Sequence, residues 1–212
     1  MHEHWLQRWE DGHIGWHRDL VHPALTSHWP ARGTKVLVPL CGKSIDLCWL
    51  ADQGHQVTGI ELAERAVRAF FAEQNMPHDV VPGALPAWRA QSAPITLHCG
   101  DYFAYRQGGF EAHYDRGALV ALPPSLRPAY AKHTTSLLAA NAEQLVVTVE
   151  YDSSIADGPP YAIPPSELQR YWPQLECVER REILAEAPPK FRAAGLTSVI
   201  EAVWRTRLNH GF

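Results

Sequence analysis

The sequence predicts an open α/β fold in which a mostly parallel sheet is covered by helices on both faces, as in doubly wound, Rossmann-like proteins. Residues 35–40 (KVLVPL) form a continuous apolar run, as expected for a strand buried on both faces. Apolar runs and amphipathic segments then alternate along the chain, which is typical of a parallel sheet with crossover helices. The last two predicted strands are joined by a loop at 188–195 without a helix, so we expect them to pair antiparallel at one edge of the sheet.

The first half of the chain shows clear signals for its elements. A helix is predicted at 44–53, where Ser44 can cap its start. A strand follows at 56–61. Residues 63–75 have the pattern of an amphipathic helix, and residues 77–94, rich in proline and glycine, are expected to form a loop or a short helical turn.

The second half continues the alternation of strands and helices. The predicted elements are strands at 95–99 and 111–115, a helix at 124–140, a strand at 144–150, a short helix at 165–172, and strands at 177–184 and 196–206. The 212 residues contain no internal repeat, no low-complexity tract and no linker long enough to divide them. One domain is therefore expected over residues 1–212.

Composition excludes several classes of protein. No apolar run reaches the roughly 18 residues that a membrane helix needs, and no export signal is visible at the N-terminus. The net charge of −4 is spread along the chain, which argues against a nucleic-acid partner. The four cysteines form no C-x-x-C pair, so reduced thiols and a cytoplasmic location are expected.

The turn after the first strand contains Gly42-Lys43-Ser44, which could end a phosphate-binding loop. That motif requires a second glycine five residues before Gly42, but Leu37 stands there, inside the predicted strand. A dinucleotide fingerprint requires three glycines, and this turn has one. A phosphate-binding loop and a dinucleotide-binding turn are therefore both disfavoured. A nicotinamide-linked oxidoreductase is disfavoured for the same reason, because it needs the dinucleotide pattern. Lys43 is expected to be solvated near the turn.

Glu61 ends the second predicted strand, 19 residues after Gly42. A carboxylate at this position can accept hydrogen bonds from both hydroxyls of a ribose. A ribose without a pyrophosphate is typical of S-adenosylmethionine, and Gly42 would allow the methionine half of that molecule to approach the turn. The alternative is a solvated acid at the end of a strand, and Glu61 alone does not decide between them.

Polar groups also follow the next two strands of the predicted sheet. Asp101 and Tyr102 follow the strand at 95–99, and we expect the carboxylate to accept from an adenine amino group and the ring to pack on the adenine face. Asp115 and Arg116 end the strand at 111–115. Because ligands in open α/β sheets lie beyond the carboxyl ends of the strands, these residues are expected at one rim.

Four segments carry a resemblance to the thiopurine S-methyltransferase family: WLQRWEDGHIGWH (5–17), VLVPLCGKSIDLCWLADQGHQVTGIEL (36–62), YDRGALVAL (114–122) and GPPYAIPPSEL (158–168). They occur in order over nearly the whole chain. The resemblance implies the class I methyltransferase fold, S-adenosylmethionine as methyl donor and a soft nucleophile as acceptor.

The resemblance also implies a set of binding residues. Its cofactor contacts fall on Trp9, Leu40, Glu61 and Arg116. Trp5 matches a second aromatic residue of the N-terminal segment, Trp16 matches the aromatic residue that lines the acceptor pocket, and Asp101 and Tyr102 align with positions on the adenine side. Trp5 and Trp9 share one helical face, and residues 1–30 are expected to form a helical lid over the cofactor.

The acceptor side departs from the family pattern at one position. An arginine expected before the last strand is replaced by Lys190, which keeps the charge but not the planar fork, and Arg192 could take over. Methyl transfer from a sulfonium is a direct in-line displacement on an unprotonated nucleophile. Arg116 and Lys190 are our candidates for favouring the acceptor anion, and His17 is a candidate acceptor contact.

The function expected is methyl transfer from S-adenosylmethionine to the sulfur of small aromatic or heterocyclic thiols, and also to selenium or tellurium compounds. The alternative is a nucleoside-binding or S-adenosylmethionine-binding regulatory module without catalysis. No metal is expected, because the spacing of His13, His17 and His22 fits no single helical face. A small-molecule acceptor is the expected partner, and a monomer is the expected state.

Overall fold

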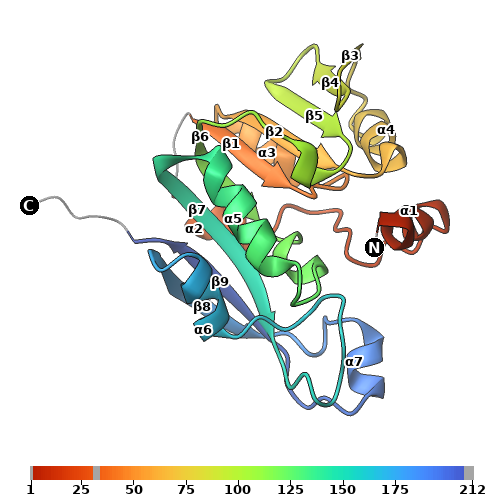
Figure 1. Cartoon of the computed structure of the whole chain (residues 1–212). Helices are drawn as coiled ribbons and strands as arrows, with labels where there is room; N and C mark the ends of the chain where they lie inside the picture. Colours follow the sequence, from red (N-terminus) through yellow and green to blue (C-terminus); the bar gives the residue numbers. More distant parts are fainter. Residues whose placement is uncertain (1, 31–33, 208–212) are drawn as a thin grey trace, which may run out of the picture.

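The computed structural model describes residues 2–30 and 34–207, and its nine strands form one sheet (Figure 1). The strand order is β3-β4-β5-β2-β1-β6-β7-β9-β8. The strands are β1 (Lys35–Pro39), β2 (Gln56–Glu61), β3 (His78–Val81), β4 (Ala87–Ala90), β5 (Ile95–Cys99), β6 (Phe110–Asp115), β7 (Leu138–Glu150), β8 (Leu175–Glu182) and β9 (Ile200–Thr206).

The five central strands are parallel, as predicted. The chain passes from β1 to β2 on one side of the sheet and later returns to place β6 on the other side of β1. This reversal creates a switch point at the carboxyl ends of β1 and β6, where ligands bind in open α/β sheets.

Helices cover both faces of the sheet. The helices are α1 (His2–Glu10), α2 (Pro23–His28), α3 (Asp46–Asp52), α4 (Glu64–Glu73), α5 (Arg127–Leu137), α6 (Pro165–Tyr171) and α7 (Pro189–Ala193), with short 3-10 turns η1 (Tyr102–Ala104) and η2 (Leu119–Ala121). In Figure 1, α1 lies beside α4 at the right, and α7 lies below it.

Successive side chains of the strands point to opposite faces of the sheet and pack into two hydrophobic cores. On β1, Val36 and Val38 face a core shared with α2, α3 and α4, whereas Leu37 faces a core shared with α5 and α6. The same alternation occurs on β7, where Leu145 and Val146 join opposite cores. Burial on both faces explains why the central strands are continuous apolar runs.

Several sequence-based boundaries require correction. Residues 77–94 form the antiparallel hairpin β3–β4 instead of a loop, so the sheet has antiparallel strands at both edges. The helix predicted at 124–140 spans only Arg127–Leu137, because Leu138 already pairs with Phe110 in the sheet. The loop predicted at 188–195 contains α7. The antiparallel pairing of β8 with β9 at the edge is confirmed.

The segment after α1 is anchored to the sheet by Asp46. This carboxylate is buried and accepts one hydrogen bond from the Tyr114 hydroxyl and another from the His22 amide, both at 2.8 Å. The His22 ring lies 3.3 Å from the carboxylate of Glu201 on β9. The cap position lies one residue later than predicted, at Ile45, while the Ser44 hydroxyl just before it accepts from the Asp46 amide at 3.3 Å.

Candidate active site

The turn after β1 has an unusual backbone. Leu40 and Gly42 both have positive φ angles, of 46° and 56°. A left-handed conformation costs a non-glycine residue roughly 1–2 kcal/mol, and such strain concentrates at functional sites. The turn is held in place from β2, because the Cys41 amide donates to the carbonyl of Ile60 at 3.1 Å.

Glu61 connects the turn after β1 with the residue that precedes α4. One carboxylate oxygen accepts from the Gly42 amide and the other from the Ala63 amide, each at 2.8 Å. Burial raises the pKa of Glu61, and the hydrogen bonds from Ala63 and Gly42 oppose that rise. Each carboxylate oxygen has a further lone pair, so the side chain can still accept from two hydroxyls of a ligand. The solvated-acid reading of Glu61 is therefore wrong, since the residue is 6% exposed.

Trp9 covers the same turn from α1. A β-carbon on Gly42 would lie 3.4 Å from the indole of Trp9, and the ring packs with Ala63 and Ala66. Trp16 meets Trp9 edge to face, with ring centroids 5.7 Å apart, and it meets Trp5 at 5.2 Å. The predicted i, i+4 pair of α1 is thus joined by Trp16 into one aromatic cluster above the strand ends.

Asp101 and Tyr102 follow β5 but point in different directions. The Asp101 carboxylate accepts from the Phe103 amide at 2.9 Å and lies 3.7 Å from the ring of His2 on α1. The Tyr102 ring is 4% exposed, and its hydroxyl bonds Thr134 at 2.9 Å. That ring belongs to the core, so the expectation that its face packs on adenine requires correction. Asp101 is the side chain at the rim.

Asp115, at the end of β6, and Arg116, just after it, differ in burial and in what they contact. The Asp115 carboxylate is buried and organises the following turn by accepting from the amides of Ala118 and Leu119 and from the Tyr130 hydroxyl. Arg116 is half-buried. Its charge is among those that depress the pKa of His17, after burial and the charge of Lys43. The pKa of His17 therefore responds to the charges of both Lys43 and Arg116.

Lys190 lies on α7 and donates to the carbonyl of Asp157 at 2.8 Å. Burial lowers its pKa; the charge of Asp157 opposes this, and the charge of Arg8 adds to it. Arg192 instead donates to the carbonyls of Leu184 and Ala185, at 2.7 and 2.9 Å. The structure thus commits Arg192 to the loop before α7, whereas Lys190 binds the carbonyl of Asp157.

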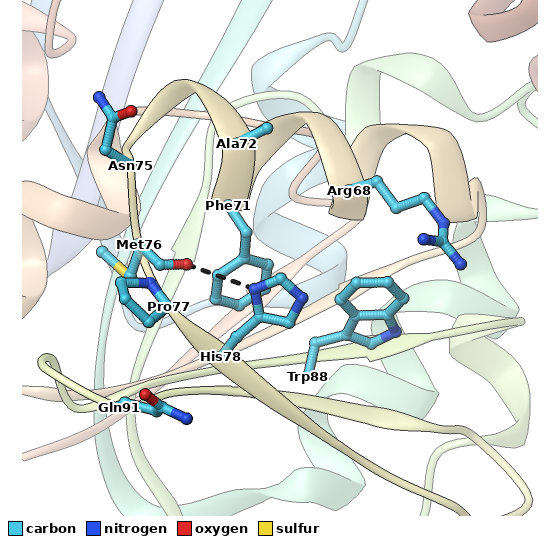
Figure 2. Close-up of a pocket in the computed structure, with 9 residues that line it drawn as sticks. All are labelled: Arg68, Phe71, Ala72, Asn75, Met76, Pro77, His78, Trp88 and Gln91. Carbon is cyan, nitrogen blue, oxygen red and sulfur yellow. Dashed lines mark hydrogen bonds between the residues drawn. The ribbon is translucent and has the colours of Figure 1, made fainter.

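A broad surface hollow lies elsewhere on the molecule. Figure 2 shows it between α4 and the β3–β4 hairpin, with a volume of about 680 Å³. Its lining residues are Arg68, Phe71, Ala72, Asn75, Met76, Pro77, His78, Trp88 and Gln91. None of the predicted site residues lines it, and a stacked column of rings forms its floor. We place the site at the strand ends, where buried polar groups converge.

Comparison with known proteins decides the family. A model described as thiopurine S-methyltransferase matches residues 1–209. The chain belongs to the thiopurine S-methyltransferase family. It is therefore a methyltransferase that uses S-adenosylmethionine as its methyl donor. The predicted family, fold class and donor are confirmed.

Relatives within this family match over nearly their whole length. A thiopurine S-methyltransferase from Pseudomonas putida is 44% identical over 211 residues, covering 95% of this chain and 96% of the relative. One from Bordetella petrii is 41% identical and covers 96% of both chains.

Solved structures show the same fold at low sequence identity. A 1,6-didemethyltoxoflavin-N1-methyltransferase from Burkholderia thailandensis, with bound 1,6-didemethyltoxoflavin and S-adenosylhomocysteine, superposes with a TM-score of 0.63 at 19% identity, covering 97% of this chain and 86% of that one. TehB from Haemophilus influenzae superposes with a TM-score of 0.60 at 16% identity, over 90% and 63% of the two chains.

Two residues of this edge escaped the sequence-based prediction. Ala63 contributes a backbone amide to Glu61, which no side-chain pattern reveals. Arg8 places its guanidinium 4.9 Å from the ring centre of Trp16. Its position three residues after Trp5 was a usable signal, because residues three apart are neighbours on a helix. Among the described residues, no group of three or more metal-ligating side chains is assembled, and no helix is long and apolar enough to cross a membrane.

Proposed function

We propose that the enzyme methylates the sulfur of small aromatic or heterocyclic thiols. The proposal is supported by the aromatic cluster of Trp5, Trp9 and Trp16 and by two cations, Arg116 and Lys190, that form no ion pair with any residue of the ranges 2–30 and 34–207. Trp5 and Trp16 offer ring surfaces for a flat acceptor. Arg116 and Lys190 offer positive charge, which favours a thiolate over a thiol.

The cofactor contacts proposed here are Trp5, Trp9, Leu40, Gly42, Glu61, Asp101, Tyr102 and Arg116. Glu61 would accept from the ribose hydroxyls, and Asp101 from the adenine amino group. Tyr102 would contribute its backbone amide, because it is the first residue of a 3-10 turn and its ring is buried. The buried carboxylate at the end of β2 and the strained turn at Leu40 both support a nucleoside site. Trp9, which already covers Gly42, would exclude water from it as part of an N-terminal lid over residues 1–30.

Bound S-adenosylmethionine supplies an electrophilic methyl group on a sulfonium. The protein is then required mainly to align the acceptor, exclude water and hold the nucleophile unprotonated. We assign alignment to Trp16 and charge stabilisation to Arg116 and Lys190. His17 is assigned as an acceptor contact. Because its pKa is lowered, chiefly by burial and then by Lys43, its ring stays neutral at pH 7.

Selenium and tellurium compounds are proposed as further acceptors, because they are soft nucleophiles of the same kind as thiolates.

The remaining expectations are a single domain, a monomer and a cytoplasmic location, with a small molecule as the only partner. Light scattering tests the monomer: a mass of twice the chain's 23.8 kDa would contradict it.

The test is transfer of a labelled methyl group from S-adenosylmethionine to matched acceptors. The panel contains a thiopurine, an aromatic thiol, selenite and tellurite, with the corresponding hydroxypurine and phenol as oxygen controls. We expect label on the two sulfur compounds and on the products of selenite and tellurite, and none on the hydroxypurine or the phenol. Tight binding of S-adenosylmethionine without transfer to any acceptor would instead support a regulatory binding module.

A further inference from the structure

The loop that joins β3 to β4 ends at the carboxyl end of β5, beside the proposed contacts with the nucleoside. The Cys99 amide donates to the carbonyl of Pro86 at 2.9 Å, which fixes the end of this loop to the last residue of β5. The residue before Pro86 in the loop is Leu85. The β3–β4 hairpin, which extends the sheet beside β5 (Figure 1), therefore also brings a loop to the edge where the parallel strands end.

The side chain of Leu85 lies against Gly100, the first residue after β5. A β-carbon on Gly100 would lie 3.2 Å from both Cγ and Cδ2 of Leu85, and Gly100 has a φ of 147°, which residues with a side chain rarely adopt. The Gly100 amide donates to the carbonyl of Glu61 at 2.8 Å, and Asp101 is the next residue along the chain. Leu85 thus lies between the proposed contacts with the ribose and with the adenine.

This part of the rim has an aliphatic side chain where the sequence predicts an aromatic one. The Tyr102 ring is 4% exposed and its hydroxyl bonds Thr134, so the ring is not available to a ligand. Leu85 is half-buried: part of its side chain packs on the core that contains Tyr102 and Ile60, and part stays accessible. The polar groups of adenine lie on its edge, so its faces gain free energy from contact with an apolar side chain.

We propose that Leu85 packs against the adenine ring of bound S-adenosylmethionine and so takes the role predicted for the Tyr102 ring. The proposal rests on the proposed cofactor contacts, because Glu61 and Asp101 place the nucleoside at this edge. Asp101 binds the polar edge of the base, and Leu85 excludes water from its face. Gly100 is then required because a larger residue would displace Leu85. The β3–β4 hairpin, on which no predicted site residue lies, thereby becomes part of the cofactor site.

Two unreactive ligands separate contact with the base from all other contacts. S-adenosylhomocysteine contains adenine, ribose and homocysteine, and S-ribosylhomocysteine lacks only the base. In calorimetry, Leu85→Ala should bind S-adenosylhomocysteine about 5- to 10-fold more weakly than wild type, whereas its affinity for S-ribosylhomocysteine should change less than about twofold. Leu85→Met keeps an apolar side chain of similar volume and should bind both ligands nearly as wild type does.

Val80→Ala is the matched control, because Val80 is an exposed aliphatic residue on β3 of the same hairpin. It should leave the affinity for both ligands unchanged. Equal weakening of the two ligands by Leu85→Ala, or an unchanged affinity of that variant for S-adenosylhomocysteine, would overturn the proposed contact.

Methyl NMR of the wild-type protein tests the contact without relying on the fold of Leu85→Ala. The δ-methyl signals of Leu85 are assigned by their loss in Leu85→Met. Because an aromatic ring shifts methyl groups on its face upfield, we expect these signals to move upfield on addition of S-adenosylhomocysteine, while the methyl signals of Val80 stay in place. Leu85 signals that do not respond to saturating S-adenosylhomocysteine would contradict the proposal.

Glu61→Gln separates this inference from the proposed cofactor contacts on which it rests. Both ligands carry the ribose, so this variant should weaken both to a similar degree. If Glu61→Gln changed neither affinity while Leu85→Ala weakened only the adenine ligand, the ribose assignment would fail and the contact of Leu85 with the base would stand. If Glu61→Gln weakened both ligands and Leu85→Ala neither, the Leu85 contact alone would be wrong.

Discussion

The carboxylate of Glu61 accepts the amide of Gly42 at 2.8 Å and so ties the end of β2 to the turn that follows β1. Its second oxygen accepts the amide of Ala63 at the start of α4. One buried side chain therefore sets the relative positions of the turn, the second strand and the helix beside the lid. The remaining lone pairs of the same carboxylate are the proposed contact with the ribose.

Gly42→Ala tests whether the lid rests on this turn. At φ 56°, alanine is strained by about 1–2 kcal/mol, and its β-carbon would also lie 3.4 Å from the Trp9 indole. Gly12→Ala is the matched control, since Gly12 has φ 70° and open space around it. Both variants should lose similar stability in urea unfolding, but only Gly42→Ala should weaken binding of S-adenosylmethionine. Equal affinities in the two variants would contradict contact between Trp9 and the cofactor turn.

Deleting residues 1–18 should abolish cofactor binding and leave the sheet folded. The deletion removes the aromatic cluster of Trp5, Trp9 and Trp16, but it keeps the anchor in which His22 binds Asp46 and Glu201. Far-UV circular dichroism should show the spectrum of the remaining α/β fold with a cooperative thermal transition. Normal affinity of the truncated protein in calorimetry would show that the segment is no lid.

The central sheet could be predicted from sequence because its strands are buried on both faces. Gln56–Glu61 and Ile95–Cys99 are found at the predicted residues, and their apolar side chains, Val57, Ile60, Ile95 and Leu97, are buried in the core. The hairpin at 78–90 escaped prediction because its strands have four residues each and β3 is largely exposed. Residues 138–143 have good helix formers, yet pairing with β6 overrides that propensity.

For the candidate site, the sequence was enough to predict that Glu61, Asp101 and Arg116 follow strands that end at one edge of the sheet. The carboxyl ends of all strands in a parallel sheet lie at that edge. The orientation of Tyr102 could not be predicted in this way. Its ring turns into the core because Thr134 on α5 offers a partner for its hydroxyl. The Arg8 position depends likewise on where Trp16 folds back onto α1, which is a tertiary contact.

Affinity for S-adenosylmethionine should fall as the pH is lowered from 7 toward the ordinary pKa of a glutamate, about 4.3. Burial raises the pKa of Glu61 above the ordinary value, so the carboxylate takes up a proton before an exposed one does. A protonated carboxyl gains a donor and loses acceptors, which weakens the bonds to ribose hydroxyls. The stability of the fold changes with pH in the opposite sense. A carboxyl pKa that is raised on folding stabilises the folded state at low pH, and this stabilisation is lost as the pH rises through the folded-state pKa.

Calorimetry at several pH values separates the two effects. Because this ionisation does not destabilise the free protein at low pH, a loss of affinity there without a fall in the melting temperature would identify ligand binding as the cause. In Glu61→Gln the affinity should be weak and independent of pH over the same range. A wild-type affinity that stays constant down to the ordinary pKa of a glutamate would contradict the raised pKa of Glu61.

The most direct measurement is titration of S-adenosylmethionine into wild type, Glu61→Gln and Glu64→Gln at pH 7. Glu64 is an exposed acid three residues further along that pairs with Arg68, so its variant removes a charge nearby without touching the buried carboxylate. Hydrogen bonds to a charged group contribute about 1.5–3 kcal/mol each, so Glu61→Gln should bind roughly 10- to 100-fold more weakly. Glu64→Gln should bind as wild type does. Unchanged affinity in Glu61→Gln would contradict the assignment of the ribose to Glu61 and, with it, the proposed cofactor site.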